Sequence, residues 1–207
     1  MKKYSMLLLL YVGIIFTISA QKFYFDIGPG LGLGMTKIDG NNVADQFEPF
    51  GKIDQDIFSV GLGAGYKYFN HIPLFFIGEI VMVNNDLDGD NNNPVFGTFI
   101  STLIGPRVVY YPVPLVQLGV SFGYSLAYGG SSGLNNYGID DYNHFGSGIA
   151  WNISSAVDLG RGRHGWLIGL KYFHSITTLG QSNMFGIFTK YAFRNKQKSV
   201  LSIKYVY

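Results

Sequence analysis

The chain has 207 residues and a formal net charge of +2, and its composition is 47% hydrophobic and 16% aromatic but only 14% charged. An average soluble domain is about a quarter charged, so this composition argues against an ordinary water-exposed globule. The near-neutral charge gives no support for nucleic-acid binding, and the absence of cysteine excludes disulfides, a lipid-modified cysteine anchor and thiolate metal sites.

The chain begins with a segment typical of a secretory signal peptide, residues 1–20. Two lysines precede an apolar core, Met6–Phe16, and a small-residue cleavage site ends at Ala20. An uncleaved anchor is the alternative, which the short apolar core disfavours. We therefore expect residues 21–207 to form one mature domain. No later apolar run reaches the ~18 residues that a membrane-spanning helix needs.

The first stretch after the signal peptide, residues 23–35, alternates large apolar side chains with small ones. One face carries phenylalanine, isoleucine, leucine and methionine, and the other is dominated by glycine. The same period of two recurs in residues 58–68, 115–128 and 145–159. This period, kept over ten or more residues, predicts β-strands. Five further stretches follow it less cleanly: residues 73–83, 98–111, 166–176, 185–193 and 201–207.

These strands are too long for a typical globular sheet, where strands of ~5–6 residues are commonest. They match the ~9–11 residues with which a tilted strand crosses a bilayer. Glycine and alanine have no polar side chain for water to solvate, so the face that carries them is suited to the inside of a narrow barrel. The face with large apolar side chains is suited to contact with lipid. Closure is required because open strand edges cannot be satisfied in hydrocarbon. We predict an all-β fold, a closed antiparallel transmembrane β-barrel.

The number of strands is the open point of this prediction. Nine strand-like segments are present, whereas bacterial single-chain barrels have an even number. The last two segments, 185–193 and 201–207, are the ones in doubt, because either could end a barrel. We predict eight strands, with ten as the alternative.

The connections between the segments alternate in length and charge. Short ones surround Asn70, Pro112 and Arg161, and long ones are predicted at residues 38–54, 84–94 and 129–142, as in outer-membrane barrels. The long connections hold most of the acidic residues, opposed by only two lysines. These acidic residues are Asp39, Asp45, Glu48, Asp54, Asp86, Asp88, Asp90, Asp140 and Asp141.

With these features the chain resembles the small outer-membrane β-barrels of Gram-negative-type bacteria, the superfamily of the outer-membrane-protein A transmembrane domain. The resemblance rests on the signal peptide, the alternating strands, the loop asymmetry and the final SIKYVY, which ends in the aromatic Tyr207. It covers nearly the whole mature chain and implies residence in the bacterial outer membrane. No motif singles out a subfamily.

Charged residues also fall on the small, inward face of the predicted strands. They are Asp26, Lys67, Glu79, Arg107, Asp158, Lys171, Lys190 and Lys204. One interpretation is a plug of ion pairs, favoured because side chains can fill an eight-stranded barrel. The other is a charged lining for solute passage, in which inward glycines such as Gly63 would widen the lumen.

Asp86, Asp88 and Asp90 supply hard oxygen ligands at alternate positions, a pattern that suits calcium. The helix–loop–helix calcium motif would need glycine and glutamate where this chain has Asn91 and Gly97, so that motif fails. We predict at most a weakly bound divalent cation and no other cofactor.

Two further groups of residues are candidate sites. His174 and Ser175 look like a catalytic pair, but adjacent strand residues point to opposite faces, so no catalytic site is predicted. The aromatic residues Trp151, Trp166, Tyr110 and Tyr66 are assigned to lipid-interface girdles.

The sequence thus favours a non-enzymatic outer-membrane barrel that presents acidic external loops. Its expected partners are outer-membrane lipids and a surface or envelope ligand, and nucleic acid is not expected. The alternatives are a narrow channel for small or apolar solutes and, less favoured, a lipid-modifying enzyme. The sequence does not indicate the oligomeric state.

Overall fold

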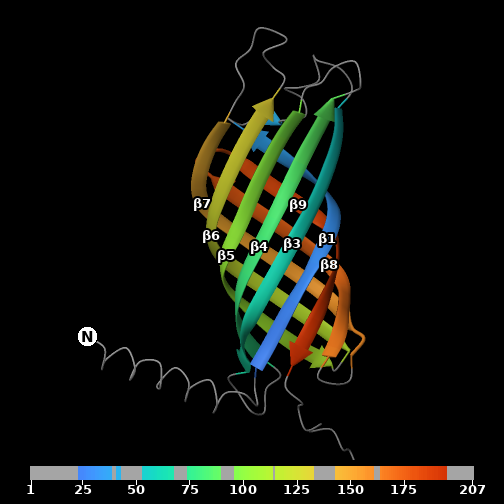
Figure 1. Ribbon diagram of the computed structural model, residues 1–207. Helices are drawn as coiled ribbons and strands as arrows, with labels where there is room; N and C mark the ends of the chain where they lie inside the picture. The colour runs from blue at the N-terminus through green and yellow to red at the C-terminus, as the bar shows by residue number, and fades with distance from the viewer. Residues whose placement is uncertain are drawn as a thin grey trace, which may run out of the picture.

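The computed structural model describes residues 23–38, 41–42, 53–67, 74–89, 96–113, 115–132, 143–160 and 164–194. The predicted signal peptide and the last predicted strand, residues 201–207, lie outside this part. Nearly all described residues belong to one antiparallel sheet (Figure 1). Its strands are β1 (Phe23–Ile38), β2 (Asn41–Asn42), β3 (Ile53–Lys67), β4 (Leu74–Gly89), β5 (Phe96–Val113), β6 (Val116–Ser132), β7 (Asn143–Asp158), β8 (His164–Thr177) and β9 (Gln181–Arg194).

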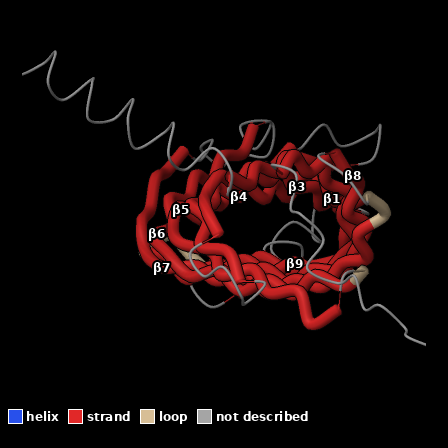
Figure 2. Tube along the Cα trace, turned by 90° about the horizontal axis from the view of Figure 1, so that it is seen from below, coloured by secondary structure: helices blue, strands red, loops and turns tan. Residues whose placement is uncertain are grey.

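The sheet closes on itself because β1 pairs with β9 as well as with β3. Viewed from below, the strands form a continuous ring (Figure 2). The two-residue β2 pairs only with the end of β1, so the wall consists of eight strands. The predicted eight-stranded barrel is confirmed, and the alternative of ten is wrong for the described wall. Residues 185–193 lie within β9, the closing strand.

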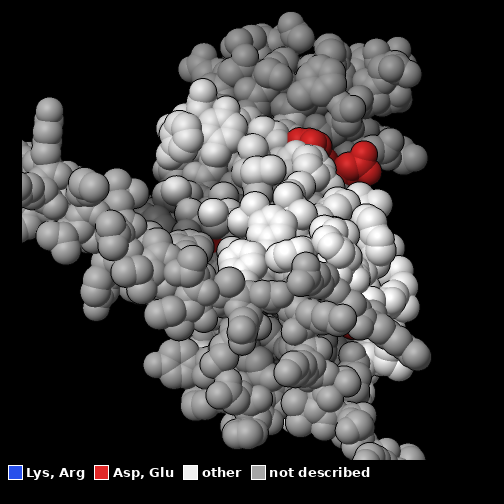
Figure 3. Space-filling view, turned by 60° about the horizontal axis from the view of Figure 1, so that its bottom comes forward, with Lys and Arg blue, Asp and Glu red and all other residues white. Residues whose placement is uncertain are grey.

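Large apolar side chains cover the outside of the barrel. Phe122, for example, is 56% exposed, whereas the next residue inward, Ser121, is buried. The outward-facing charged side chains of the described wall, Lys37, Asp56 and Asp86, lie near the C-terminal ends of β1 and β4 and the N-terminal end of β3. These strand ends are at the top of the barrel in Figure 1. On the face shown in Figure 3, the part of the wall left uncovered is almost entirely white. No helix among the described residues is long and apolar enough to span a membrane.

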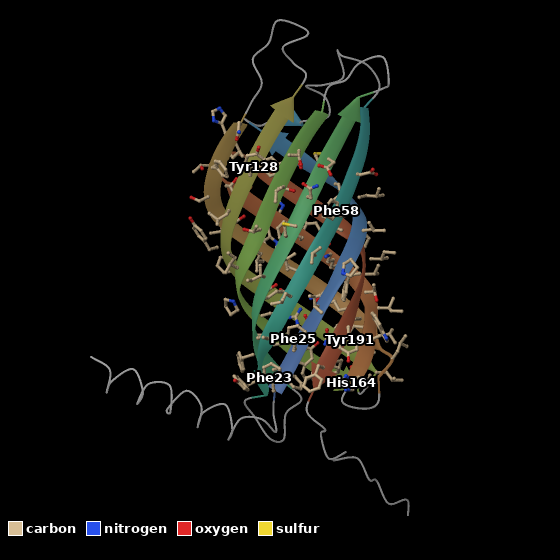
Figure 4. All side chains as sticks on the ribbon, viewed as in Figure 1. Phe23, Phe25, Phe58, Tyr128, His164 and Tyr191 are labelled. Carbon is tan, nitrogen blue, oxygen red and sulfur yellow. The ribbon has the colours of Figure 1, made fainter. Side chains whose placement is uncertain are left out.

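Aromatic rings form a girdle near the lower end of the wall (Figure 4). Phe23 packs edge-on against Tyr66 at 5.8 Å between ring centroids, and Trp166 packs against Tyr191 at 5.6 Å. His164 is hydrogen-bonded to Tyr191. Such rings are typical of the boundary between hydrocarbon and water.

A second group of aromatic rings lies higher on the wall. The ring of Trp151 packs at a tilt against His174 with 4.3 Å between centroids, and Tyr128 packs against Phe145 at 5.0 Å. Tyr128 and Phe58 are labelled near the upper end in Figure 4. The predicted outward positions of Trp151, Trp166, Tyr110 and Tyr66 agree with the exposure pattern.

The strands continue further at the upper end than the sequence indicated. Asp54, Asp86 and Asp88 were predicted in loops, but they lie within β3 and β4, where Asp54 is paired with Asp88 and Asp56 with Asp86. Above the apolar belt both faces of the sheet can contact water, so strand pairing can continue through polar residues. The β8–β9 connection is also short, a turn in which the amide of Thr177 donates to the carbonyl of Gly180.

Candidate functional site

Four charged side chains from four strands meet inside the barrel. They are Asp26 on β1, Glu79 on β4, Arg107 on β5 and Lys190 on β9, and each is nearly inaccessible to solvent. Strand register brings the two carboxylates close, because Gly63 on β3 pairs with Asp26 on one side and with Glu79 on the other. We call these four residues the ion cluster.

The ion cluster is paired throughout. Arg107 contacts Asp26 through Nη2 and Glu79 through Nη1, the latter at 2.6 Å. Lys190 Nζ lies 3.3 Å from Asp26 Oδ1 and 3.2 Å from Glu79 Oε1. Each cation therefore bridges both carboxylates, which is the arrangement that offsets the cost of removing charges from water.

Neutral side chains complete the hydrogen bonding of Glu79. Ser121 Oγ donates to Glu79 Oε2 at 2.6 Å, and Asn152 Nδ2 lies 3.4 Å from the same oxygen. Both side chains are buried on the inner faces of β6 and β7. These hydrogen bonds and the two ion pairs hold the carboxylate of Glu79 in one position.

Gly63 makes room for the ion cluster. A Cβ atom at this position would lie 3.0 Å from Arg107 Nη2, 3.0 Å from Asp26 Oδ1 and 3.0 Å from the side chain of Ile77. The absence of a side chain therefore lets the cluster fill the space, and the glycine does not line an open lumen.

We expect Gly63→Leu to destabilise the barrel by about 1–3 kcal/mol, the usual cost of overpacking a filled interior. Gly78→Ala is the matched control, because a Cβ there meets only the carbonyl oxygen of Ala64 at 3.7 Å. The urea midpoint of unfolding in lipid vesicles, followed by tryptophan fluorescence, measures both. Equal midpoints for the two variants would contradict a filled site at Gly63.

A second network extends from the cluster toward the lower end. Tyr24 Oη donates to Asp26 Oδ2 at 2.9 Å, and Gln117 Nε2 donates to the hydroxyls of Tyr24 and Tyr111 at 2.9 and 2.7 Å. Tyr111 Oη donates to Asp158 Oδ2 at 3.2 Å. Buried polar side chains thus form a connected chain from the middle of the barrel to the β7–β8 turn.

Lys171 belongs to the same interior but differs in its partners. Its buried ammonium group contacts the hydroxyl of Ser59. Within the described residues it takes part in no ion pair. The remaining predicted interior charges, the side chains of Lys67 and Lys204, lie outside the described part.

Apolar side chains fill the barrel on both sides of the ion cluster. The lower group includes Phe75, Val109 and Leu167, and the upper group includes Leu103, Phe173 and Met184. Together with the ion cluster, these groups form the buried interior of the barrel.

Of the three acidic residues considered as calcium ligands, the structure describes the side chain of Asp86 alone. Asp86 accepts hydrogen bonds from Asn84 Nδ2 at 2.7 Å and from Thr98 Oγ1 at 2.7 Å. No group of three potential metal ligands occurs in the described part of the chain. The side chain of Asp88 and the whole of Asp90 lie outside it, so the calcium prediction stays a prediction.

The structure separates His174 from Ser175, as the strand geometry requires. Ser175 is fully buried in the interior, whereas His174 lies on the outer face against Trp151. The neutral partners Tyr24, Gln117 and Ser121 were not among the site residues predicted from the sequence. Their inward positions in the period-two pattern were the signal that could have found them.

The fold and the filled interior define a class: small, closed, antiparallel barrels with an apolar exterior. The sequence matches no family model and no curated protein. Among solved structures, the chain is similar to Ail, the attachment invasion locus protein of Yersinia pestis. The structure of Ail in complex with the heparin analogue sucrose octasulfate has a TM-score of 0.57 and 14% identity, covering 83% of this chain and 98% of that one.

A second structure of Ail from Yersinia pestis gives a TM-score of 0.55 and 14% identity, covering 84% of this chain and 99% of that one. Neisserial surface protein A shows a weaker likeness, with a TM-score of 0.45 and 11% identity over 81% of this chain and 95% of that one. The chain has the fold of the small outer-membrane β-barrels, and the predicted resemblance is confirmed at the level of the fold.

Proposed function

We propose that the chain is a non-enzymatic barrel of the bacterial outer membrane that anchors acidic external segments for binding a surface or envelope ligand. The observation that carries this proposal is the wall itself, which is apolar outside and filled by ion pairs inside. A closed barrel with an apolar belt satisfies its backbone within lipid.

The filled interior weighs against the alternative of a narrow channel. The ion cluster and the apolar groups on both sides of it are buried inside the barrel. The functional surface of this proposal therefore lies outside the wall, at the upper end, where Asp56 and Asp86 face outward.

The charge of that end favours a cationic ligand. Asp56 and Asp86 face outward at the upper end of β3 and β4, and the neighbouring segments of the sequence carry Asp45, Asp140 and Asp141. The heparin analogue in the Ail complex is a sulfate ester, and an anion of that kind would be repelled by these carboxylates. We infer a basic ligand for this chain.

We expect the barrel, reconstituted in phosphatidylcholine vesicles, to bind a lysine-rich peptide with an affinity that falls as salt rises, because salt screens exposed charges. Replacing Asp54, Asp88, Asp140 and Asp141 by asparagine should weaken this binding, and Lys52→Gln should not. Fluorescence anisotropy of a labelled peptide measures it. Preference for sucrose octasulfate, or peptide binding unchanged in the asparagine variant, would contradict a basic ligand.

A further inference from the structure

A layer of small hydroxyl side chains lies inside the barrel above the upper apolar group. Leu103, Phe173 and Met184 belong to that group. On the same strands, the next inward positions toward the upper end are occupied by serines, and β6 contributes another. These serines are Ser101 on β5, Ser125 on β6, Ser175 on β8 and Ser182 on β9, all fully or almost fully buried.

Strand pairing places these serines at one level. Ser175 pairs with Ser182, and Ser125 pairs with Gly148. Ser101 pairs with Ala127, the inward-facing residue of β6 next after Ser125. The β5–β9 side of the interior therefore carries only small side chains at this level, and the buried Ile57 and Val83 face it from β3 and β4. We call these serines the serine layer.

The serine layer is closed from above by the β8–β9 turn. Leu179 in this turn is only 7% exposed and packs with Phe99 and Ala127 across the mouth of the barrel. It also lies against Gly146, where a Cβ atom would come within 2.6 Å of Leu179 Cβ. The layer thus lies between two apolar groups.

Three hydroxyls of the serine layer lack a protein partner. The Oγ atoms of Ser101, Ser125 and Ser175 are buried and accept or donate no hydrogen bond within the described part of the protein. Buried polar groups are nearly always hydrogen-bonded, because leaving one unpaired is costly. Three such groups at one level therefore point to a molecule that supplies their hydrogen bonds.

The chemistry of the layer restricts that molecule. None of its described inward side chains is ionisable, so the layer offers hydroxyl donors and acceptors but no compensating charge. A charged ligand would be poorly stabilised between two apolar groups. A small neutral molecule that both donates and accepts hydrogen bonds fits these groups.

We propose that the serine layer is a binding site for a small uncharged hydroxyl compound, either water or a short polyol, which enters past Leu179. A depression of about 360 Å³ lies beside the same turn, lined by Lys37, Ile176 and residues 177–181. It borders the turn that closes the layer.

The experiment uses the full refolded barrel in lipid nanodiscs, with nuclear magnetic resonance of the amides of Ser101, Ser125 and Ser175. Cross-relaxation with long-lived water is recorded first, and glycerol is then titrated as the polyol probe. The test variant replaces these three serines by alanine, with Ser175→Ala alone as a milder second variant. Ser155→Ala, on the exposed face of β7, is the matched control.

We expect water cross-peaks at the three amides, unchanged in the control variant and lost in the triple variant. Saturable shifts with glycerol identify a polyol site, and water cross-peaks that glycerol does not alter identify a water site. A barrel that shows neither signal overturns the proposal. Water or glycerol signals that persist in the triple variant also overturn it. If the triple variant does not fold, signals that persist at position 175 in Ser175→Ala overturn it instead.

Discussion

Arg107→Met is expected to destabilise the barrel by about 3–5 kcal/mol, because it leaves buried carboxylates without their principal cation. Arg107 is 2% exposed and bridges Asp26 and Glu79. In the variant only Lys190 would face both anions. Urea unfolding in lipid vesicles, followed by the fluorescence of Trp151 and Trp166, measures the change in the free energy of unfolding.

A second variant separates charge from packing. Neutralising all four members of the ion cluster, by Asp26→Asn, Glu79→Gln, Arg107→Met and Lys190→Met, removes the buried charges together. Replacing a complete buried ion cluster by neutral side chains is often nearly neutral for stability. We therefore expect this variant to be more stable than Arg107→Met alone. If it is equally or more destabilised, the ion cluster contributes through shape and not through charge compensation.

Val120→Arg tests the outer face of the wall in the same way. Val120 is 55% exposed on β6, between Val108 and Ile153 on the neighbouring strands. If this surface contacts the centre of a bilayer, the arginine should cost about 2–4 kcal/mol. The measurement is again the free energy of unfolding in lipid vesicles.

Val113→Arg is the matched control for position in the membrane. Val113 is 50% exposed at the lower end of β5, beside the turn to β6. An arginine near the interface costs only about 0–1 kcal/mol. Equal effects at positions 120 and 113 would contradict a wall that crosses hydrocarbon.

The sequence predicted the wall well because period-two alternation is a local property. Each inward or outward assignment, such as Asp26 inside and Leu33 outside, needs only its neighbours in the chain. The ends of β3 and β4 were predicted less well, because polar residues such as Asp86 read as loop when the pairing partner is unknown. Strand pairing depends on two segments together, so it cannot be predicted from the alternation of residues within one segment.

The ion cluster shows the same limit. From the sequence, its four members were predicted to face inward together with other charged residues. Which of these charged residues contact one another could not be predicted. That depends on the register that places Gly63 between Asp26 and Glu79. Lys171, also inward, finds the hydroxyl of Ser59 and no described carboxylate, a difference that no local pattern contains.

The seam between β1 and β9 has a consequence for the order in which the molecule can assemble. It joins positions far apart in the chain, and Lys190 and Asp26, on its two strands, are separated by 164 residues. Contacts of such separation form late and slowly. Until they form, β1 has an open edge that hydrocarbon does not tolerate, and Asp26 lacks Lys190. A partly inserted barrel is therefore destabilised both by the open edge of β1 and by the missing partner of Asp26. We expect the strands to cross the membrane and the barrel to close in one cooperative event.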